Sequence, residues 1–242
     1  KHVGVNVAAD PLYTLSYTGV NGGLVVVAAD DPGMHSSQNE QDSRMHARAS
    51  QVPMLEPADS EECRTFMRYA FELSEEYDCP VMLRTTTRIA HARSLTDEEE
   101  RAEQPMRAYE KSVPKWVMVP ASAKGRHPVV EARMEKLSRA LLPVDREEMR
   151  DTKVGIICSG IAYQYVREAL PEASVLKLGL VNPLPRTRIE EFAKKVEKLY
   201  VIEELEPVIE EQVASWGIPC EGKALTGSMY ELNTQLLRER VL

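Results

Sequence analysis

A continuous run of apolar and β-branched residues near the start of the chain limits its fold more than any other feature. Leu24 to Ala29 reads LVVVAA, with no polar residue between the apolar ones. Strands of this kind are covered on both faces, as central strands of parallel sheets are. Gly22-Gly23 precedes the run, and the turn sequence Asp30-Asp31-Pro32-Gly33 ends it. We therefore predict a central parallel strand at residues 24–29.

A helix and a second strand follow this run. Asp59 is a candidate N-cap with Glu62 three residues later, and apolar residues then recur at helical spacing as far as Tyr77. Cys79-Pro80 ends that helix, and residues 81–87 read as a strand. The order strand, helix, strand predicts a βαβ unit and hence an α/β fold.

A second block of the same kind begins near residue 152. Strands are predicted at 154–158, 175–180 and 199–202, with helices at 161–170, from Thr187 as N-cap, and from Pro207 to Gly217. Between the blocks, residues 94–151 contain five prolines and a charge run, and only 131–142 has a helical pattern. We therefore predict two parallel-sheet β/α domains joined by an irregular connector.

Charge and cysteine usage restrict the partners. The net charge of −8, without a cluster of Lys and Arg, argues against nucleic acid and anionic membrane surfaces. No apolar run approaches the roughly 20 residues of a spanning helix, and no secretion signal is recognisable, so we expect a cytoplasmic location. The four cysteines lie far apart, which predicts buried free thiols and no metal or cluster site within the chain.

The polar stretch after the first strand is the candidate site, because ligands of open parallel sheets gather beyond the strands' carboxyl ends. His35 can move a proton, Gln38 both donates and accepts hydrogen bonds, and Arg44 could bind a carboxylate or fix the loop by pairing with Asp42. The remaining polar side chains of this stretch are Ser36, Ser37, Asn39 and Gln41. A solvated turn would have a similar composition, so composition alone does not decide.

Several stretches of the sequence resemble the large subunit of indolepyruvate ferredoxin oxidoreductases. They are KHVGVNVAADPL at 1–12, GGLVVV at 22–27, ADDPGMHSSQNEQD at 29–42, PMLEP at 53–57 and PVMLRTTTR at 80–88. The resemblance implies that residues 1–120 are the later part of a thiamine-diphosphate pyrimidine-binding domain, and that 121–151 form the connector. It further implies a transketolase C-terminal-like domain at 152–222 and a linker at 223–242 toward a diphosphate-binding domain outside this chain.

The same resemblance implies an enzyme that oxidatively decarboxylates aryl-2-oxo acids such as indolepyruvate to aryl-acetyl-coenzyme A. Thiamine diphosphate with Mg²⁺ and iron–sulfur clusters would serve as cofactors, with their motifs mostly outside this chain, and coenzyme A would be a substrate. A small beta subunit and ferredoxin would be partners in an oligomer. His35, Gln38 and Arg44 are then candidate catalytic residues, and His2, Asn6 and the polar loop residues are candidates to face the cofactor. We expect the chain to be a fragment that is inactive alone.

Two alternatives remain open at this stage. The enzyme could act on another 2-oxo acid, such as pyruvate or a branched-chain acid, because the scaffold is shared. The chain could instead be a folded scaffold or interface with all chemistry elsewhere, and binding of thiamine diphosphate would separate these cases. Glu203-Glu204, which follows the last predicted strand, could titrate in a cleft, be solvated, or dock a basic side chain of a partner.

Overall fold

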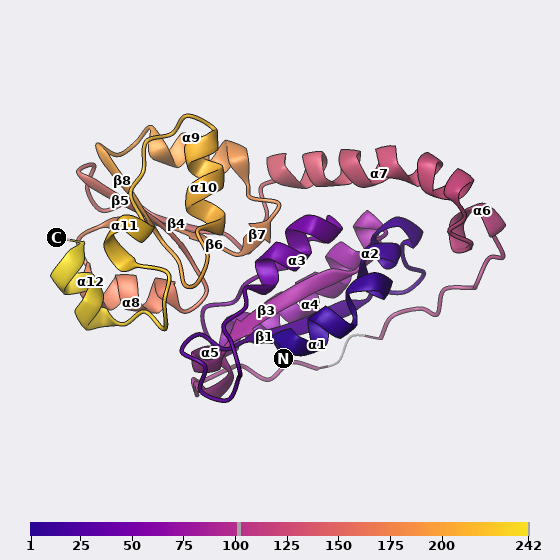
Figure 1. Ribbon diagram of the computed structural model, residues 1–242, viewed down its shortest axis with the longest axis horizontal. Helices are drawn as coiled ribbons and strands as arrows, with labels where there is room; N and C mark the ends of the chain where they lie inside the picture. Colours follow the sequence, from indigo (N-terminus) through magenta and orange to yellow (C-terminus); the bar gives the residue numbers. More distant parts are fainter. Residues whose placement is uncertain (101–102, 242) are drawn as a thin grey trace.

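The computed structural model describes residues 1–100 and 103–241 and contains two four-stranded sheets that lie side by side, each flanked by helices (Figure 1). The strand orders are β1-β3-β2-β7 in the first sheet and β4-β6-β5-β8 in the second. The predicted α/β class is confirmed. Both sheets are mixed rather than purely parallel, since each contains one antiparallel pairing.

The first sheet contains β1 (Val25–Asp30), β2 (Met54–Leu55) and β3 (Val81–Thr86), which run parallel, and β7 (Leu180–Asn182), which is antiparallel to β2. Ala28 and Met82 pack with buried residues of α1 (His2–Val7), α2 (Ala9–Thr18) and α3 (Ser43–Ser50). Val81 and Leu83 pack with α4 (Ser60–Tyr77) on the opposite face. Asp59 caps α4 as predicted, accepting the Glu62 N–H at 2.8 Å.

The prediction that residues 24–29 form a central strand was wrong. Within the described residues β1 lies at the edge of its sheet, and Val27 is 52% exposed. The central position next to it belongs to β3, whose side chains are nearly all buried. An apolar run shows that a strand has hydrophobic faces, but it carries no information about which strands pair on either side.

The second sheet contains β4 (Arg146–Glu148), β5 (Val154–Ser159), β6 (Ser174–Leu178) and β8 (Lys198–Ile202). β5 pairs parallel with both β6 and β8, while β4 pairs antiparallel with β6. Helices α8 (Ala162–Ala169) and α12 (Thr234–Arg240) pack in one apolar cluster, and α9 (Arg186–Ala193) and α10 (Val208–Ser215) pack in the other. The core therefore lies on both faces of this sheet.

The predicted strand at 175–180 is divided between the two sheets. β6 ends at Leu178 in the second sheet, and β7 begins at Leu180 in the first, so the chain crosses between sheets at Gly179. A Cβ atom at Gly179 would lie 2.3 Å from the carbonyl oxygen of Val144, which leaves room only for glycine. Through this crossing, the second block of sequence contributes strand β7 to the first sheet.

Three other segments differ from their predictions. Between the two blocks lie α6 (Val113–Trp116) and a long α7 (Pro120–Arg139), which starts at a proline and contains Pro128, where only 131–142 was predicted helical. α9 begins at Arg186, with Pro185 rather than Thr187 in the N-cap position. The expected linker at 223–242 contains α11 (Lys223–Thr226) and α12, with Leu237 and Val241 buried in the core; Leu242 lies outside the described residues.

Candidate functional site

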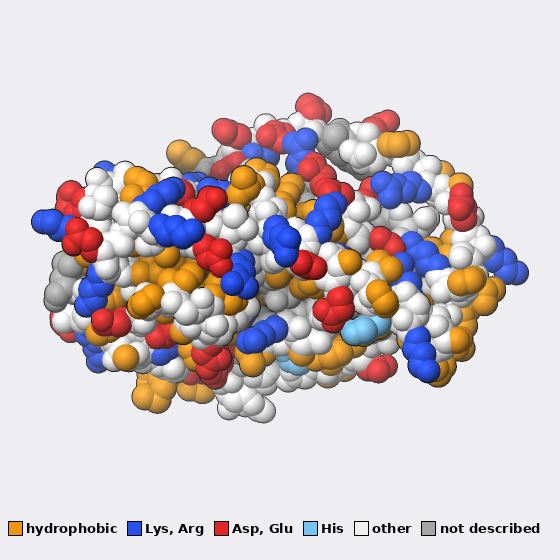
Figure 2. Space-filling model, turned by 90° about the horizontal axis from the view of Figure 1, so that it is seen from above, with side chains coloured by type: hydrophobic (Ala, Val, Ile, Leu, Met, Phe, Trp, Pro, Cys, Tyr) orange, Lys and Arg blue, Asp and Glu red, His pale blue; other side chains and the backbone are white. Residues whose placement is uncertain are grey.

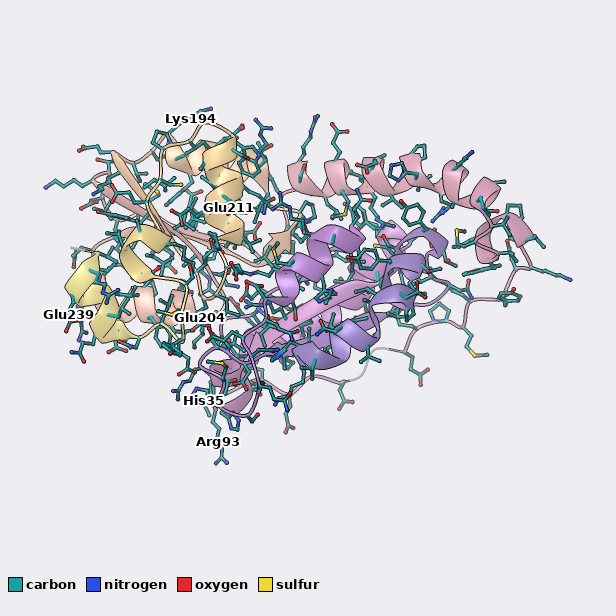
Figure 3. All side chains as sticks on the ribbon, viewed as in Figure 1. His35, Arg93, Lys194, Glu204, Glu211 and Glu239 are labelled. Atoms are coloured by element: carbon teal, nitrogen blue, oxygen red, sulfur yellow. The ribbon has the colours of Figure 1, made fainter. Side chains whose placement is uncertain are left out.

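The carboxyl ends of strands from both sheets meet at one place in the molecule. β1 ends at Asp30, β5 at Ser159, and β8 is followed by Glu203-Glu204. The Ser159 hydroxyl donates to Glu56 Oε2 at 2.9 Å, which connects the end of β5 to the residue after β2. Figure 3 shows Glu204 between the two halves of the molecule. Strand ends of parallel pairs are where α/β folds place ligands, so we take this junction as the candidate site.

Two fully buried arginines hold the junction together. Arg84 Nε donates to Asp30 Oδ2 at 2.6 Å and its Nη1 donates to Glu56. Arg44 Nη2 donates to Asp42 Oδ2 at 2.6 Å and Nη1 to Glu203 Oε2 at 2.5 Å. Burial alone would lower the pKa of Arg44, but Asp42 and Glu203 outweigh it and raise that pKa well above its ordinary value. Both guanidiniums are therefore charged and held in buried ion pairs.

Arg44 was predicted either to bind a carboxylate or to fix the loop by pairing with Asp42, and the structure shows the pairing. Its guanidinium is 1% exposed and points beneath the loop, where it also donates to the carbonyl oxygens of Glu204 and Glu206. It pairs with Asp42, whose carboxylate also caps α3 by accepting the Arg44 N–H at 3.0 Å. Burial raises the pKa of Asp42, but Arg44 and Arg84 outweigh it and lower that pKa to about 2. Arg44 thus fixes the loop to the second sheet.

Asp31 organises the loop from within. Its carboxylate accepts the backbone N–H groups of His35 at 3.2 Å and Ser36 at 2.9 Å. The hydroxyls of Ser37 and Thr87 donate to it at 2.6 and 2.7 Å. Burial raises the pKa of Asp31, but these hydrogen bonds outweigh it and lower the pKa well below its usual range. The loop is therefore folded around a buried negative charge.

The structure brings several predicted residues together on the outer side of this loop. Asn6 Nδ2 donates to Gln41 Oε1 at 2.8 Å, and Gln41 Nε2 donates to Asn39 Oδ1 at 2.9 Å. Lys1 Nζ donates to the carbonyl oxygen of Ser36, so the start of α1 borders the loop. Four polar side chains of the loop are open to solvent, namely His35, Ser36, Gln38 and Asn39.

Buried polar atoms without partners lie on the α1 side of the same sheet. His2 is 1% exposed, and within the described residues neither of its ring nitrogens has a hydrogen-bond partner. Thr86 Oγ1 and Arg84 Nη2 also lack partners there. Thr86 is in register with Asp30 at the carboxyl ends of β3 and β1. Because buried polar groups are nearly always paired, these atoms are places for ordered water or ligand atoms.

A cavity of about 450 Å³ opens beside the loop. It lies between the start of the loop, α8 and the residues before α12, and its lining includes Gly33, His35, Arg88, Tyr165, Tyr230 and Glu231. Glu204 lies close by and accepts the Leu232 N–H at 3.2 Å. Burial raises the pKa of Glu204 to about 7, and the Leu232 hydrogen bond offsets only part of this. A larger hollow of about 710 Å³, along α4, residues 96–100 and Gln104, is lined by none of these groups.

Sequence reasoning missed the acids that build the site. Asp30 and Asp31 were interpreted only as a turn, and Glu56 was not considered as a site residue. Glu203 and Glu204 had three open interpretations, none of which was an ion pair within the chain, and the structure shows Glu203 paired with Arg44. The available signal was position: all four acids at 30–31 and 203–204 directly end or follow a buried strand.

The described residues contain no group of three or more His, Cys, Asp or Glu side chains placed to hold a metal ion. The four cysteines are free, and burial raises the pKa of each thiol. Over the same part of the chain, no helix has the length and apolar character needed to cross a membrane. Figure 2 shows acidic and basic side chains interspersed over one face rather than gathered in a stripe of one sign.

The sequence is similar over its whole length to curated proteins named indolepyruvate oxidoreductase subunit IorA. It is 41% identical over 261 aligned residues to the protein from Pyrococcus horikoshii and 40% identical over 262 to that from Methanothermobacter thermautotrophicus. By sequence, the chain matches a part of these subunits. It spans about 40% of the length of these IorA relatives. No family model matches the sequence.

Solved structures share the fold of this IorA-like chain. A 2-oxoglutarate:ferredoxin oxidoreductase from Magnetococcus marinus, solved with 2-oxoglutarate, coenzyme A and succinyl-CoA, matches 99% of the chain and 51% of its own, with a TM-score of 0.73 and 15% identity. A split-gene transketolase, described as an inactive tetramer, matches 96% of the chain and 70% of its own, with a TM-score of 0.54 and 16% identity. At these identities the likeness establishes the α/β fold.

Proposed function

We propose that this chain is part of an oxidoreductase that converts aryl-2-oxo acids, indolepyruvate in particular, to aryl-acetyl-coenzyme A with ferredoxin as electron acceptor. The observation that carries the proposal is 38–43% identity to subunits named indolepyruvate oxidoreductase, extending over all or most of the chain. A small partner subunit and an oligomeric assembly belong to the same proposal. The activity is assigned to the complete protein, of which this chain supplies one wall of the site.

Thiamine diphosphate is the cofactor we propose, with Mg²⁺ and iron–sulfur clusters held by residues outside the described part of this chain. When bound, thiamine diphosphate supplies the carbanion that attacks the ketone and stores the electrons of decarboxylation. The described residues fit one side of a polar ligand: the unpaired His2 nitrogens are buried at the start of α1, and Thr86 Oγ1 is buried at the end of β3. The described residues do not fit the end of the cofactor that carries Mg²⁺ and the diphosphate, because they contain no group of side chains placed to hold a metal ion.

We propose that the loop from His35 to Asp42 lines the substrate side of this site. His35, Gln38 and Asn39 offer exposed polar side chains, while Ser36 and Ser37 fix the loop through Asp31. Asn6 and Gln41 brace it against α1. In this arrangement His35 holds or moves a proton and Gln38 donates to the substrate oxygen. Arg44 and Asp42 act as positioning residues, because their side chains are buried in ion pairs beneath the loop.

The experiment uses the full-length protein purified with its small subunit and follows ferredoxin reduction in the presence of coenzyme A. Indolepyruvate, pyruvate, 2-oxoglutarate and a branched-chain 2-oxo acid are compared by kcat/KM. We expect indolepyruvate to be preferred by about 100-fold or more, roughly 2.7 kcal/mol of differential transition-state binding. A preference for another 2-oxo acid would redirect the substrate assignment, and absence of any coenzyme A-dependent reduction would contradict the proposal.

A further inference from the structure

We propose that Arg88 and His35 form a binding subsite for the carboxylate of a small organic acid, and that Glu231 of this chain occupies the subsite from within. This subsite shares His35 with the loop assigned to the substrate side above, but binding of its ligand does not require the proposed reaction. The ligand class is a monocarboxylate with a flat, largely apolar body. The argument rests on the contacts around Glu231, on the cavity beside them and on the way its segment is held.

The contacts of Glu231 have the geometry of carboxylate recognition. Arg88 Nε and Nη2 donate to the two oxygens of Glu231 at 2.8 and 2.7 Å, and His35 Nε2 lies 3.0 Å from Oε1. A guanidinium that engages both oxygens in parallel is the arrangement that proteins use for carboxylates. The side chains of Arg88 and His35 are 54% and 45% exposed, whereas that of Glu231 is 16% exposed. The two donors are thus open to a ligand arriving from solvent.

The cavity of about 450 Å³ beside this contact gives a ligand room for more than its carboxylate. Its volume lies within the usual range of small-molecule sites. Tyr165, Tyr230 and Leu232 supply aromatic and apolar surface in its wall. Burial raises the pKa of Tyr165 to about 12, so its hydroxyl stays neutral and can donate a hydrogen bond. A flat organic body next to the carboxylate suits this lining.

The segment that carries Glu231 is held by weak contacts, so Glu231 can move away from Arg88. Tyr230 has φ 65°, which is an uncommon value for a side chain of this size. The Tyr230 N–H donates to Glu40 at distances of 3.2 and 3.4 Å, and the Leu232 N–H donates to Glu204 at 3.2 Å. Met229 and Tyr230 are 74% and 57% exposed. Displacement of Glu231 would therefore break few strong contacts.

The surrounding charge favours a single carboxylate over phosphate. Glu40 lies against the same segment, so the site already contains the negative charges of Glu40 and Glu231. A dianion would meet repulsion from them, whereas a monocarboxylate replaces one negative charge with another. The planar fork of Arg88 matches a planar carboxylate in two points. We therefore commit to an organic monocarboxylate.

The test is binding of phenylacetate to the full-length protein by titration calorimetry, with inorganic phosphate as the comparison anion. Glu231→Gln removes the internal competitor, so we expect its Kd for phenylacetate to be about 10-fold lower than that of wild type. Arg88→Ala and the charge-preserving Arg88→Lys should each weaken binding about 10-fold or more, because both lose the fork. Matched controls are Arg93→Ala, an exposed cation near His35, and Glu239→Gln on α12, which should bind as wild type (Figure 3).

Three results would overturn the proposal. Equal phenylacetate affinity in wild type and Glu231→Gln would show that Glu231 does not compete for the site. Wild-type affinity in Arg88→Ala would place the binding elsewhere, and phosphate binding as tight as phenylacetate would contradict the ligand class. A melting curve for each variant distinguishes a purely structural ion pair, because such a pair would lower Tm in Glu231→Gln without changing Kd.

Discussion

Two irregular segments of the molecule are both polar, yet they are built in opposite ways. The loop at 31–42 is folded around the buried carboxylate of Asp31 and pinned underneath by Arg44. Residues 92–100 and 103–111 are almost entirely exposed and run as a long trace along one side of the first sheet (Figure 1). Their ion pairs are half-exposed, as between Arg107 and Glu75. Buried charge beneath a segment, rather than polarity of the segment, distinguishes a candidate site from a connector.

The largest effect should come from Arg44→Ala. This change leaves Asp42 and Glu203 buried without their main cation, which typically costs about 3–5 kcal/mol. Urea unfolding of wild type and variant measures it. Arg93→Ala is the matched control, because Arg93 is exposed within the second segment. A loss below about 1 kcal/mol would mean that the buried network does not hold the loop.

A smaller effect is expected from pH at Glu204. The native state keeps this proton up to about pH 7, whereas the unfolded chain loses it near the ordinary glutamate pKa, so stability should fall as pH rises between these values. The fall is at most about 3 kcal/mol. Glu204→Gln should flatten the curve over this window, with Glu206→Gln, the exposed neighbour, behaving as wild type. Parallel curves for Glu204→Gln and wild type would contradict a raised pKa at this position.

Asp31→Asn tests the loop from within. The amide keeps the shape of the side chain but loses the charge that four donors share, and we expect a loss of about 2 kcal/mol. Hydrogen exchange should quicken at the Ser36 amide, because its acceptor is weakened. Asp97→Asn in the second segment is the matched substitution and should leave both measurements unchanged. Unaltered exchange at Ser36 would show that Asp31 does not organise the loop.

The smallest effect is expected from Glu98→Ala. Glu98 is exposed within the second segment, and surface substitutions of this kind usually change stability by less than about 0.5 kcal/mol. Limited proteolysis complements the substitution: cleavage should occur between residues 94 and 112 before any cut in the loop at 31–42. Early cleavage within the loop would contradict the claim that the loop is held more firmly than the second segment.

The sequence predicted individual helices and strands better than it predicted which strands pair with one another. The capping of α4 by Asp59 and the strands β1, β3, β5 and β8 follow from local pattern, because caps and apolar runs depend on nearby residues. The edge position of β1 and the transfer of β7 to the first sheet depend on contacts far apart in sequence. Proline usually interrupts helices, yet Pro128 lies inside α7. Arg133 of the same helix donates to the carbonyl oxygen of Ser16, which is a contact between residues far apart in sequence.

The same limit applies to the site. Position after a strand was enough to select the loop and its polar residues from the sequence. It could not reveal that Arg44 reaches Glu203, which lies 159 residues away, or that Arg84 joins Asp30 to Glu56. Pairing of buried charges is decided by tertiary packing, so the sequence gives the charges without their partners.

Turnover of Gln38→Ala in the full-length protein tests most directly whether the loop faces the reacting substrate. Gln38 is exposed and, among the described residues, its side chain makes no hydrogen bond, so its removal should leave Tm unchanged. If it donates to the substrate oxygen, indolepyruvate-dependent ferredoxin reduction should lose about 100- to 1000-fold in kcat, while Glu98→Ala keeps wild-type kinetics. Wild-type kcat and KM in Gln38→Ala would contradict the assignment of this loop to the active site.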